Sequence, residues 1–185
     1  MKDKKKEPAK FKGPIKYLSF SPHGDPEGFV LANGTFVKVP PHSLLLKDLF
    51  KIGATVSGEG ELLTEKPNRV VHRAKVHQGK KVMSDDSGTK DHRESLKEIH
   101  KKDLKARKSA PSEKIKIKGT VVAVGTKPKG EVDRIIFQDG FSVHVPKEME
   151  LSANDIAVGD KFEIKGESRA YGKNCFVKAE SVKQI

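Results

Sequence analysis

The chain has 185 residues, of which 35% are hydrophobic and 34% charged, and 37 lysines and arginines against 25 acidic residues give a net charge of +12. No run of about 18 apolar residues exists, so a transmembrane helix is excluded, and the lysine-rich start leads into no apolar segment of a secretory signal. The single cysteine excludes an internal disulfide and any zinc site built on two thiolates. We expect a cytoplasmic protein whose charge favours polyanions such as nucleic acid.

A basic tail, residues 1–12, is expected to be disordered and to precede a first domain over residues 13–77. In that domain, Phe29 to Ala32 and Thr35 to Val39 flank Asn33-Gly34, which is a strong signal for a β-hairpin. The pattern therefore predicts a domain made mostly of short strands.

Residues 78–113 form a charged linker in which Thr89 to Lys108 has high helix propensity. Glutamates and lysines three or four residues apart can support a solvated helix there, so we predict a helix over residues 89–108. Its only large apolar residues are Leu96, Ile99 and Leu104. Such a thin stripe is typical of a helix that docks weakly or forms only on binding.

A second domain over residues 114–185 carries a similar strand pattern. Ile115 to Val124 is rich in β-branched residues, and the next two strands flank Asp139-Gly140, another strong hairpin signal. The segment from Lys147 to Ile156 has room for one short helix or turn, and Leu44 to Phe50 is its counterpart in the first domain. Further strands are predicted over residues 133–138, 141–145, 161–166 and 175–182, with a loop over 168–174 between the last two.

The two domains are copies of one pattern, because the chain matches itself without a gap at a constant offset. Glycine and proline set special backbone angles, so matching positions of these residues imply matching turns. The matched pairs, each 106 residues apart, are Gly13 and Gly119, Pro22 and Pro128, Gly24 and Gly130, Gly34 and Gly140, and Gly53 and Gly159.

Five short strands with a helix between the third and fourth is the element order of an OB fold. Each copy resembles an OB-fold domain, and the chain is similar to small bacterial proteins of tandem OB folds over residues 13–77 and 114–185. The resemblance implies an all-β protein of two tandem five-stranded OB-like barrels joined by a charged, partly helical linker. It also implies binding on the outer face of strands 2 and 3, framed by the loops between strands 1 and 2 and between strands 4 and 5.

The third strand of each copy supplies the first candidate residues. Its valines match between the copies and are expected to face the core, which places Phe36 and Lys38 outside in the first copy and Ser142 and His144 outside in the second. An exposed phenyl ring beside a cation suits a single strand, whose bases stack on aromatic side chains while cations meet phosphates. The alternative is that Phe36 packs against the other domain or the linker.

The loop between the last two strands of the second copy combines cations, an aromatic ring and a flexible glycine, in Arg169, Tyr171, Gly172 and Lys173. This composition suits a nucleic-acid strand that enters a groove. A solvated hairpin tip would explain the glycine equally well. The remaining candidates are cations that would extend the basic surface of the second copy, namely Lys116, Lys118, Lys127 and Lys129.

No catalytic arrangement emerges from the sequence. No two of the seven histidines lie four residues apart and only Cys175 could supply a thiolate, so we expect neither a metal site nor a cofactor. We expect a non-enzymatic binder of single-stranded nucleic acid, RNA or DNA, with low sequence specificity and no membrane partner. The alternative is a protein-interaction module that uses the barrels and the linker helix, since aromatic residues make up only 6% of the chain.

Overall fold

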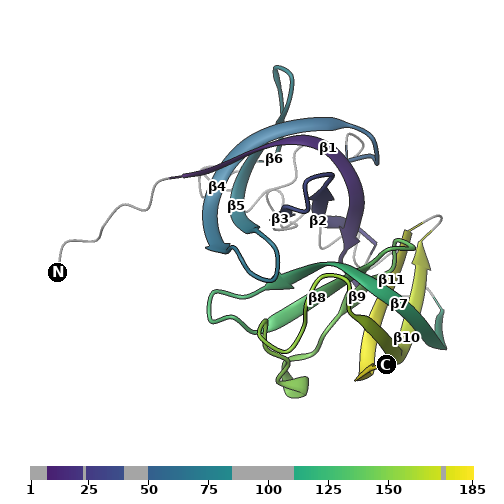
Figure 1. Ribbon diagram of the computed structural model, residues 1–185. Helices are drawn as coiled ribbons and strands as arrows, with labels where there is room; N and C mark the ends of the chain where they lie inside the picture. Colours follow the sequence, from purple (N-terminus) through teal and green to yellow (C-terminus); the bar gives the residue numbers. More distant parts are fainter. Residues whose placement is uncertain (1–7, 23, 40–49, 85–110, 172–173) are drawn as a thin grey trace.

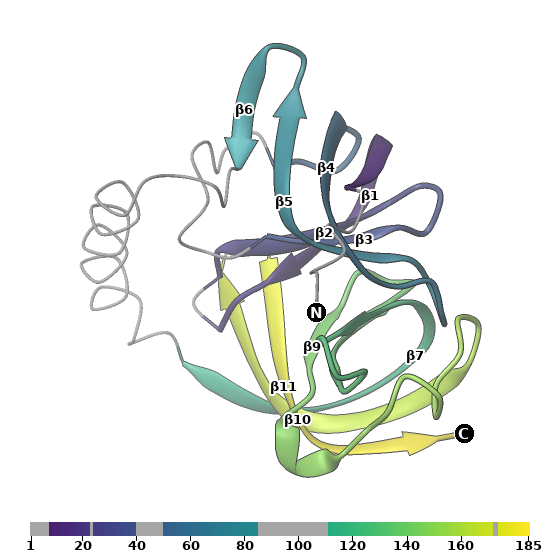
Figure 2. The same cartoon turned by 90° about the vertical axis from the view of Figure 1, so that its left-hand side faces the viewer.

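Two closed β-barrels that lie side by side make up the described part of the computed structural model, residues 8–22, 24–39, 50–84, 111–171 and 174–185 (Figures 1 and 2). In each barrel, a parallel pairing of the third strand with the fifth closes a ring of five strands. This is OB-like connectivity, and the predicted all-β fold is confirmed. No helix within the described residues is long and apolar enough to cross a membrane.

The first barrel surrounds a core of aromatic and branched side chains. The ring of Phe29 lies at its centre, with centroid distances of 6.2 Å to Phe11 and 5.9 Å to Phe50. A sixth strand, β6, pairs with β5 outside the closed ring. The strands are β1 (Ala9–Phe20), β2 (Pro26–Leu31), β3 (Phe36–Lys38), β4 (Thr55–Thr64), β5 (Val70–Gln78) and β6 (Lys81–Ser84).

The second barrel has a mainly aliphatic core that also holds Phe137 and Phe162. Pro146 precedes a single 3-10 turn, η3 (Lys147–Met149), which lies inside the segment predicted to hold a short helix or turn. The strands are β7 (Ser112–Thr126), β8 (Val132–Phe137), β9 (Ser142–His144), β10 (Lys161–Tyr171) and β11 (Asn174–Gln184).

The backbone confirms the internal repeat. Gly24 and Gly130 have φ angles of 80° and 85°, and Gly34 and Gly140 have φ angles of 84° and 92°. These left-handed conformations favour glycine, which explains why glycine stands at the same place in both copies. Strands β2 and β3 also coincide with β8 and β9 when 106 is added to their residue numbers.

The first strand begins earlier than the sequence predicts. β1 starts at Ala9, so the prediction of a disordered tail is wrong for residues 9–12, while residues 1–7 lie outside the described residues. Ala9 and Phe11 are buried and the two lysines that follow them are exposed. Buried and exposed residues alternate in this part of the strand, as in a sheet with one solvent-exposed face. Its high lysine content hides this alternation in the sequence.

Other boundaries also differ from their predictions. β6 occupies residues 81–84 of the predicted linker, and the predicted loop over 168–174 is largely strand, because β10 continues to Tyr171 and β11 starts at Asn174. The pairing of β10 with β11 runs without interruption from Gly166 to the end of this hairpin. Hydrogen bonds between the two strands therefore keep this segment extended, although its amino-acid composition is typical of a loop. The helix predicted over residues 89–108 lies outside the described residues.

Candidate functional site

The outer faces of β2 and β3, where the OB resemblance implies binding, pack against the second barrel. Val30 and Phe36 form one buried cluster with Ala123 and Ile136 of the second barrel. Phe36 is only 1% exposed. The prediction that Phe36 is exposed is therefore wrong, and the alternative, packing against the other domain, is confirmed.

The predicted alternation of β3 is correct, and the error concerns what covers its outer side. Val37 belongs to the core of its own barrel, so its neighbour Phe36 points away from that core. The ring lies against β7, where a Cβ added at Gly125 would clash with it. A hydrophobic side chain on the outside of the first barrel is thus explained by packing between the two copies.

Lys38 also points out of its barrel, and it is bound within the same interface. Its ammonium group donates to Oδ2 of Asp133 at 2.5 Å and to the carbonyl oxygen of Thr126 at 3.0 Å. The Lys38 and Asp133 side chains are 25% and 18% exposed. The expectation of a freely exposed cation at this position is therefore wrong, because the second barrel supplies its counter-charge.

A second ion pair and a side-chain amide add further directional contacts. Glu27 of β2 pairs with Arg134 of β8, and burial lowers the pKa of this arginine to about 9, which leaves it charged at neutral pH. Asn68 binds the backbone of Val124 twice, accepting from its N–H at 2.8 Å and donating to its carbonyl oxygen at 3.2 Å. The interface thus combines an apolar cluster with specific polar contacts.

Equivalent positions of the two copies meet in this interface. Val30 and Ile136, which are 106 residues apart, share the buried cluster, and the equivalent acids Glu27 and Asp133 each pair with a cation of the other copy. Phe36 packs on Gly125, while the residues equivalent to these two, Ser142 and Ser19, face each other with their hydroxyl oxygens 3.3 Å apart. The implied binding faces of the two copies therefore cover each other.

An exposed basic surface lies on the outside of the second barrel. Lys116 of β7 lies directly opposite Lys165 of β10, which in turn lies opposite Ser181 of β11. Opposite residues of an antiparallel pair share one face of the sheet, so alternate residues of these three strands gather on one side. This surface, the basic face, carries the exposed lysines Lys114, Lys116, Lys118, Lys161, Lys165, Lys178 and Lys183.

The basic face has more cations than its carboxylates can neutralise. Lys116 and Lys118, both predicted site residues, have side chains 55% and 62% exposed and share Glu163, at 3.1 and 3.6 Å. The hydrogen bond from Lys116 lowers the pKa of the Glu163 carboxyl. Among the described residues, no carboxylate lies within ion-pair distance of Lys165. The face therefore keeps a net positive charge.

A small pocket adjoins the basic face where the second barrel meets the β1–β2 turn of the first. Its volume is about 330 Å³. It brings together two predicted residues, His144 and Arg169, that lie on different strands. This junction pocket is lined by Pro22, His144, Glu167, Arg169, Phe176 and Lys178.

His144 lies on an aromatic wall of the junction pocket. Its ring stacks on Phe176 with centroids 6.1 Å apart and an interplanar angle of 27°, and the Arg134 guanidinium lies 5.7 Å from the Phe176 centroid. Burial is the main cause that lowers the pKa of His144, and the positive charge of Arg134 lowers it further. The imidazole is therefore neutral at neutral pH. Its Nδ1 is buried and has no hydrogen-bond partner in the described part of the chain.

The remaining predicted residues belong to neither the basic face nor the junction pocket. Lys127 and Lys129 lie in the turn between β7 and β8, where Lys127 faces Glu131 at 3.6 Å and Lys129 is exposed. The backbone of Tyr171 pairs with Asn174 at the end of the β10–β11 hairpin. The Tyr171 side chain and Lys173 lie outside the described residues.

Sequence reasoning missed Lys165, Glu167, Phe176 and Lys178. A signal was present in β10, where charged residues alternate with core residues from Lys161 to Arg169 and so mark one wet face. Phe176 gave no such signal, because an aromatic residue in a predicted strand suggests a core position. It is 3% exposed, yet it stacks on His144 outside the main core cluster.

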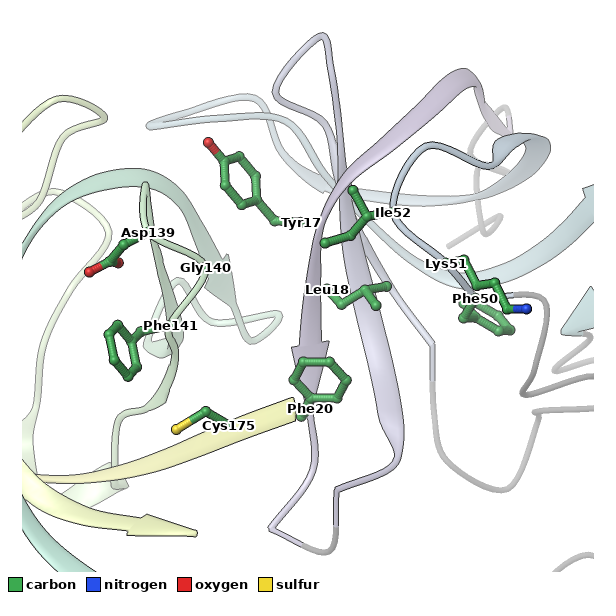
Figure 3. A pocket seen from close by; sticks show the side chains of 10 residues that line it. All are labelled: Tyr17, Leu18, Phe20, Phe50, Lys51, Ile52, Asp139, Gly140, Phe141 and Cys175. Atoms are coloured by element: carbon green, nitrogen blue, oxygen red, sulfur yellow. The ribbon is translucent and has the colours of Figure 1, made fainter. Parts of the chain in front are cut away.

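A larger apolar cleft of about 860 Å³ lies between the barrels. Figure 3 shows Tyr17, Leu18 and Phe20 along β1 on one side and Phe141 with Cys175 on the other. The cleft also includes Ile52, which is 68% exposed. Apolar surface therefore remains accessible beside the interface.

No group of three histidine, cysteine or acidic side chains gathers as a metal ion would require within the described residues. No protein-family model matches the chain, and a search of curated proteins finds no match. Inference about function therefore depends on the geometry of the basic face, the junction pocket and the cleft.

Proposed function

We propose that this chain is a non-enzymatic cytoplasmic protein that binds single-stranded nucleic acid, RNA or DNA, with little sequence preference. In this proposal the strand lies on the basic face and continues over the junction pocket. The outer faces of β2 and β3 take no part, because they are covered by the second barrel. The observation that carries the proposal is the gathering of seven exposed lysines on one side of β7, β10 and β11.

The spacing of these lysines suits contact with several phosphates at once. Alternate residues of a strand lie about 6.6–6.8 Å apart, and neighbouring strands lie about 4.7–4.9 Å apart. Lys116 directly opposite Lys165 is a repulsive cross-strand pair, and a bound polyanion would relieve that repulsion. Phosphate contacts hold a strand without reading its bases, which supports low sequence preference.

The test is fluorescence anisotropy with labelled single-stranded RNA and DNA 20-mers over a range of salt concentrations. On single strands, the logarithm of the affinity falls with the logarithm of salt concentration by about 0.7 per phosphate contact. A Lys116→Gln/Lys165→Gln variant should therefore lower that slope by about 1.4 if each lysine meets one phosphate. The matched control is Lys80→Gln/Lys81→Gln, which removes the same charge at the β5–β6 hairpin.

Equal weakening by the two double variants would mean that only net charge matters and would contradict the assigned face. Tighter binding to a duplex than to either single strand would contradict the preference for single strands. The second candidate is a protein-interaction module, which the accessible apolar cleft favours. An apolar protein contact would respond weakly to salt, so salt dependence separates the two candidates.

A further inference from the structure

We propose that the junction pocket binds a phosphate monoester carried on a hydroxylated sugar, as found in a free ribonucleotide or at the phosphorylated end of an RNA strand. The strand-end form rests on the proposed function, whereas binding of a free ribonucleotide does not. The proposal assigns the phosphate to Arg169 and Lys178 and the hydroxyl groups of the sugar to Glu167, all of which line the pocket.

Strand pairing brings the polar groups of the pocket together. Lys178 lies opposite Glu167 in the antiparallel β10–β11 ladder and beside His144 in the parallel β9–β11 pairing. Arg169 lies opposite Phe176 in the same antiparallel ladder. Opposite residues have Cβ atoms about 4.5–5.5 Å apart, so these side chains share one short stretch of surface. Because each of these residues comes from a strand of the closed second barrel, this part of the pocket is built on a fixed frame, and Pro22 of the β1–β2 turn completes the lining.

The pocket also has hydrogen-bonding capacity that the described protein leaves unused. Nδ1 of His144 is buried without a partner, although buried polar atoms in proteins are usually satisfied. Within the described residues, Arg169, Lys178 and Glu167 make no ion pair with one another, although all three line the same pocket. A ligand that accepts hydrogen bonds from Arg169 and Lys178 and donates one to Glu167 would use this capacity.

The types of these side chains define the ligand. Arginine offers a planar fork of donors that matches phosphate oxygens, and lysine adds a point charge. A carboxylate beside a phosphate is repulsive unless it accepts a hydrogen bond, and the hydroxyl groups of a ribose can donate that bond to Glu167. The flat surfaces of Pro22 and Phe176 supply apolar walls for the sugar. A volume of about 330 Å³ lies at the lower end of the range for small-molecule sites.

The first experiment is calorimetric titration of the full chain with four probes: adenosine 5′-monophosphate, its 2′-deoxy analogue, adenosine and inorganic phosphate. We expect adenosine 5′-monophosphate to bind most tightly and adenosine and phosphate to bind at least about tenfold more weakly, since each lacks one half of the recognised group. In parallel, anisotropy with RNA 10-mers compares a 5′-phosphate end with a 5′-hydroxyl end.

Two variants separate the two halves of the pocket. Arg169→Gln should abolish the advantage of the phosphorylated ligands, and Glu167→Gln should bring the affinities of the ribose and deoxyribose nucleotides close together. Lys80→Gln, at the β5–β6 hairpin outside both the basic face and the pocket, is the matched control and should leave the nucleotide affinity unchanged. Nucleotide binding should also raise the pKa of His144 in NMR titrations, because a phosphate would add a second negative charge to that of Asp133 near this imidazole.

Equal binding of adenosine and adenosine 5′-monophosphate, or equal losses in Arg169→Gln and Lys80→Gln, would overturn the phosphate assignment. Competition by inorganic phosphate as strong as that by the nucleotide would overturn the sugar assignment. If nucleotides bind in the pocket but 20-mers do not bind, the proposed function fails and this inference stands. If 20-mers bind through the basic face while end phosphorylation and free nucleotides have no effect, the inference fails and the proposed function stands.

Discussion

The substitution Phe36→Ala tests whether this side chain holds the barrels together. An aromatic side chain buries about 150–250 Å², which at about 25 cal/mol per Å² corresponds to roughly 4–6 kcal/mol of hydrophobic stabilisation. Phe36 is 1% exposed, so almost all of this applies. The alanine methyl keeps part of it, and comparable core substitutions cost about 3–5 kcal/mol. We therefore expect the free energy of unfolding to fall by about 3–5 kcal/mol.

Urea unfolding followed by far-ultraviolet circular dichroism measures this loss, since the chain contains no tryptophan as a fluorescent reporter. Val158→Ala, at a residue that is 48% exposed, is the control and should change stability by no more than about 0.5 kcal/mol. If Phe36 instead stacked on a base, its removal would cost about 1–3 kcal/mol of nucleic-acid affinity and little stability. A loss of stability below about 1 kcal/mol, together with weaker RNA binding, would refute the packing assigned here.

Three further predictions concern the same interface and the pocket beside it. Glu27→Gln should lower the free energy of unfolding by about 3–5 kcal/mol in urea, because the buried charge of Arg134 loses its partner. The double variant with Arg134→Met should recover part of that loss, and additive losses would argue against the ion pair. Asn68→Ala should cost about 1–3 kcal/mol for each backbone group of Val124 left unsatisfied, and hydrogen exchange at the Val124 amide should accelerate. Burial lowers the pKa of His144 from its ordinary value of 6.5, so the unfolded chain binds the proton more readily. Stability should therefore fall as the pH drops below about 6.5, and His144→Gln should reduce that slope in unfolding measured between about pH 7 and pH 5.

The sequence predicts the barrels well because their turns are local. Gly34 and Gly140 indicate the same hairpin turn in each copy, and both residues have a left-handed backbone conformation in the structure. Alternation in β3 also predicts correctly that Phe36 points away from its own core. What covers Phe36 could not be predicted, because Gly125 is remote in sequence and reaches the ring only through the packing of one barrel on the other.

The candidate site could also be predicted only in part from the sequence. Lys116 and Lys118 could be identified from their alternation along one strand. Lys165 could not be assigned to the same face, because its place opposite Lys116 depends on the register between β7 and β10. For the junction pocket, the sequence offers His144 and Arg169 as separate candidates, and only the closure of the barrel brings them together. Residue types are visible in a sequence, whereas registers between distant strands are not.

Equivalent positions of the two copies meet in the interface, and this arrangement makes the contact surface of each barrel specific for the other barrel. Phe36 fits because Gly125 leaves room for its ring, whereas the residue equivalent to Gly125 in the first copy is Ser19. A dimer of two first barrels through this face would set Phe36 against a serine side chain, and a dimer of two second barrels would set Ser142 against a glycine and leave a gap. The contact surfaces of the two barrels are therefore complementary but not identical. Each barrel's contact surface therefore fits the other barrel better than a second copy of itself, which disfavours dimers of two first barrels or of two second barrels.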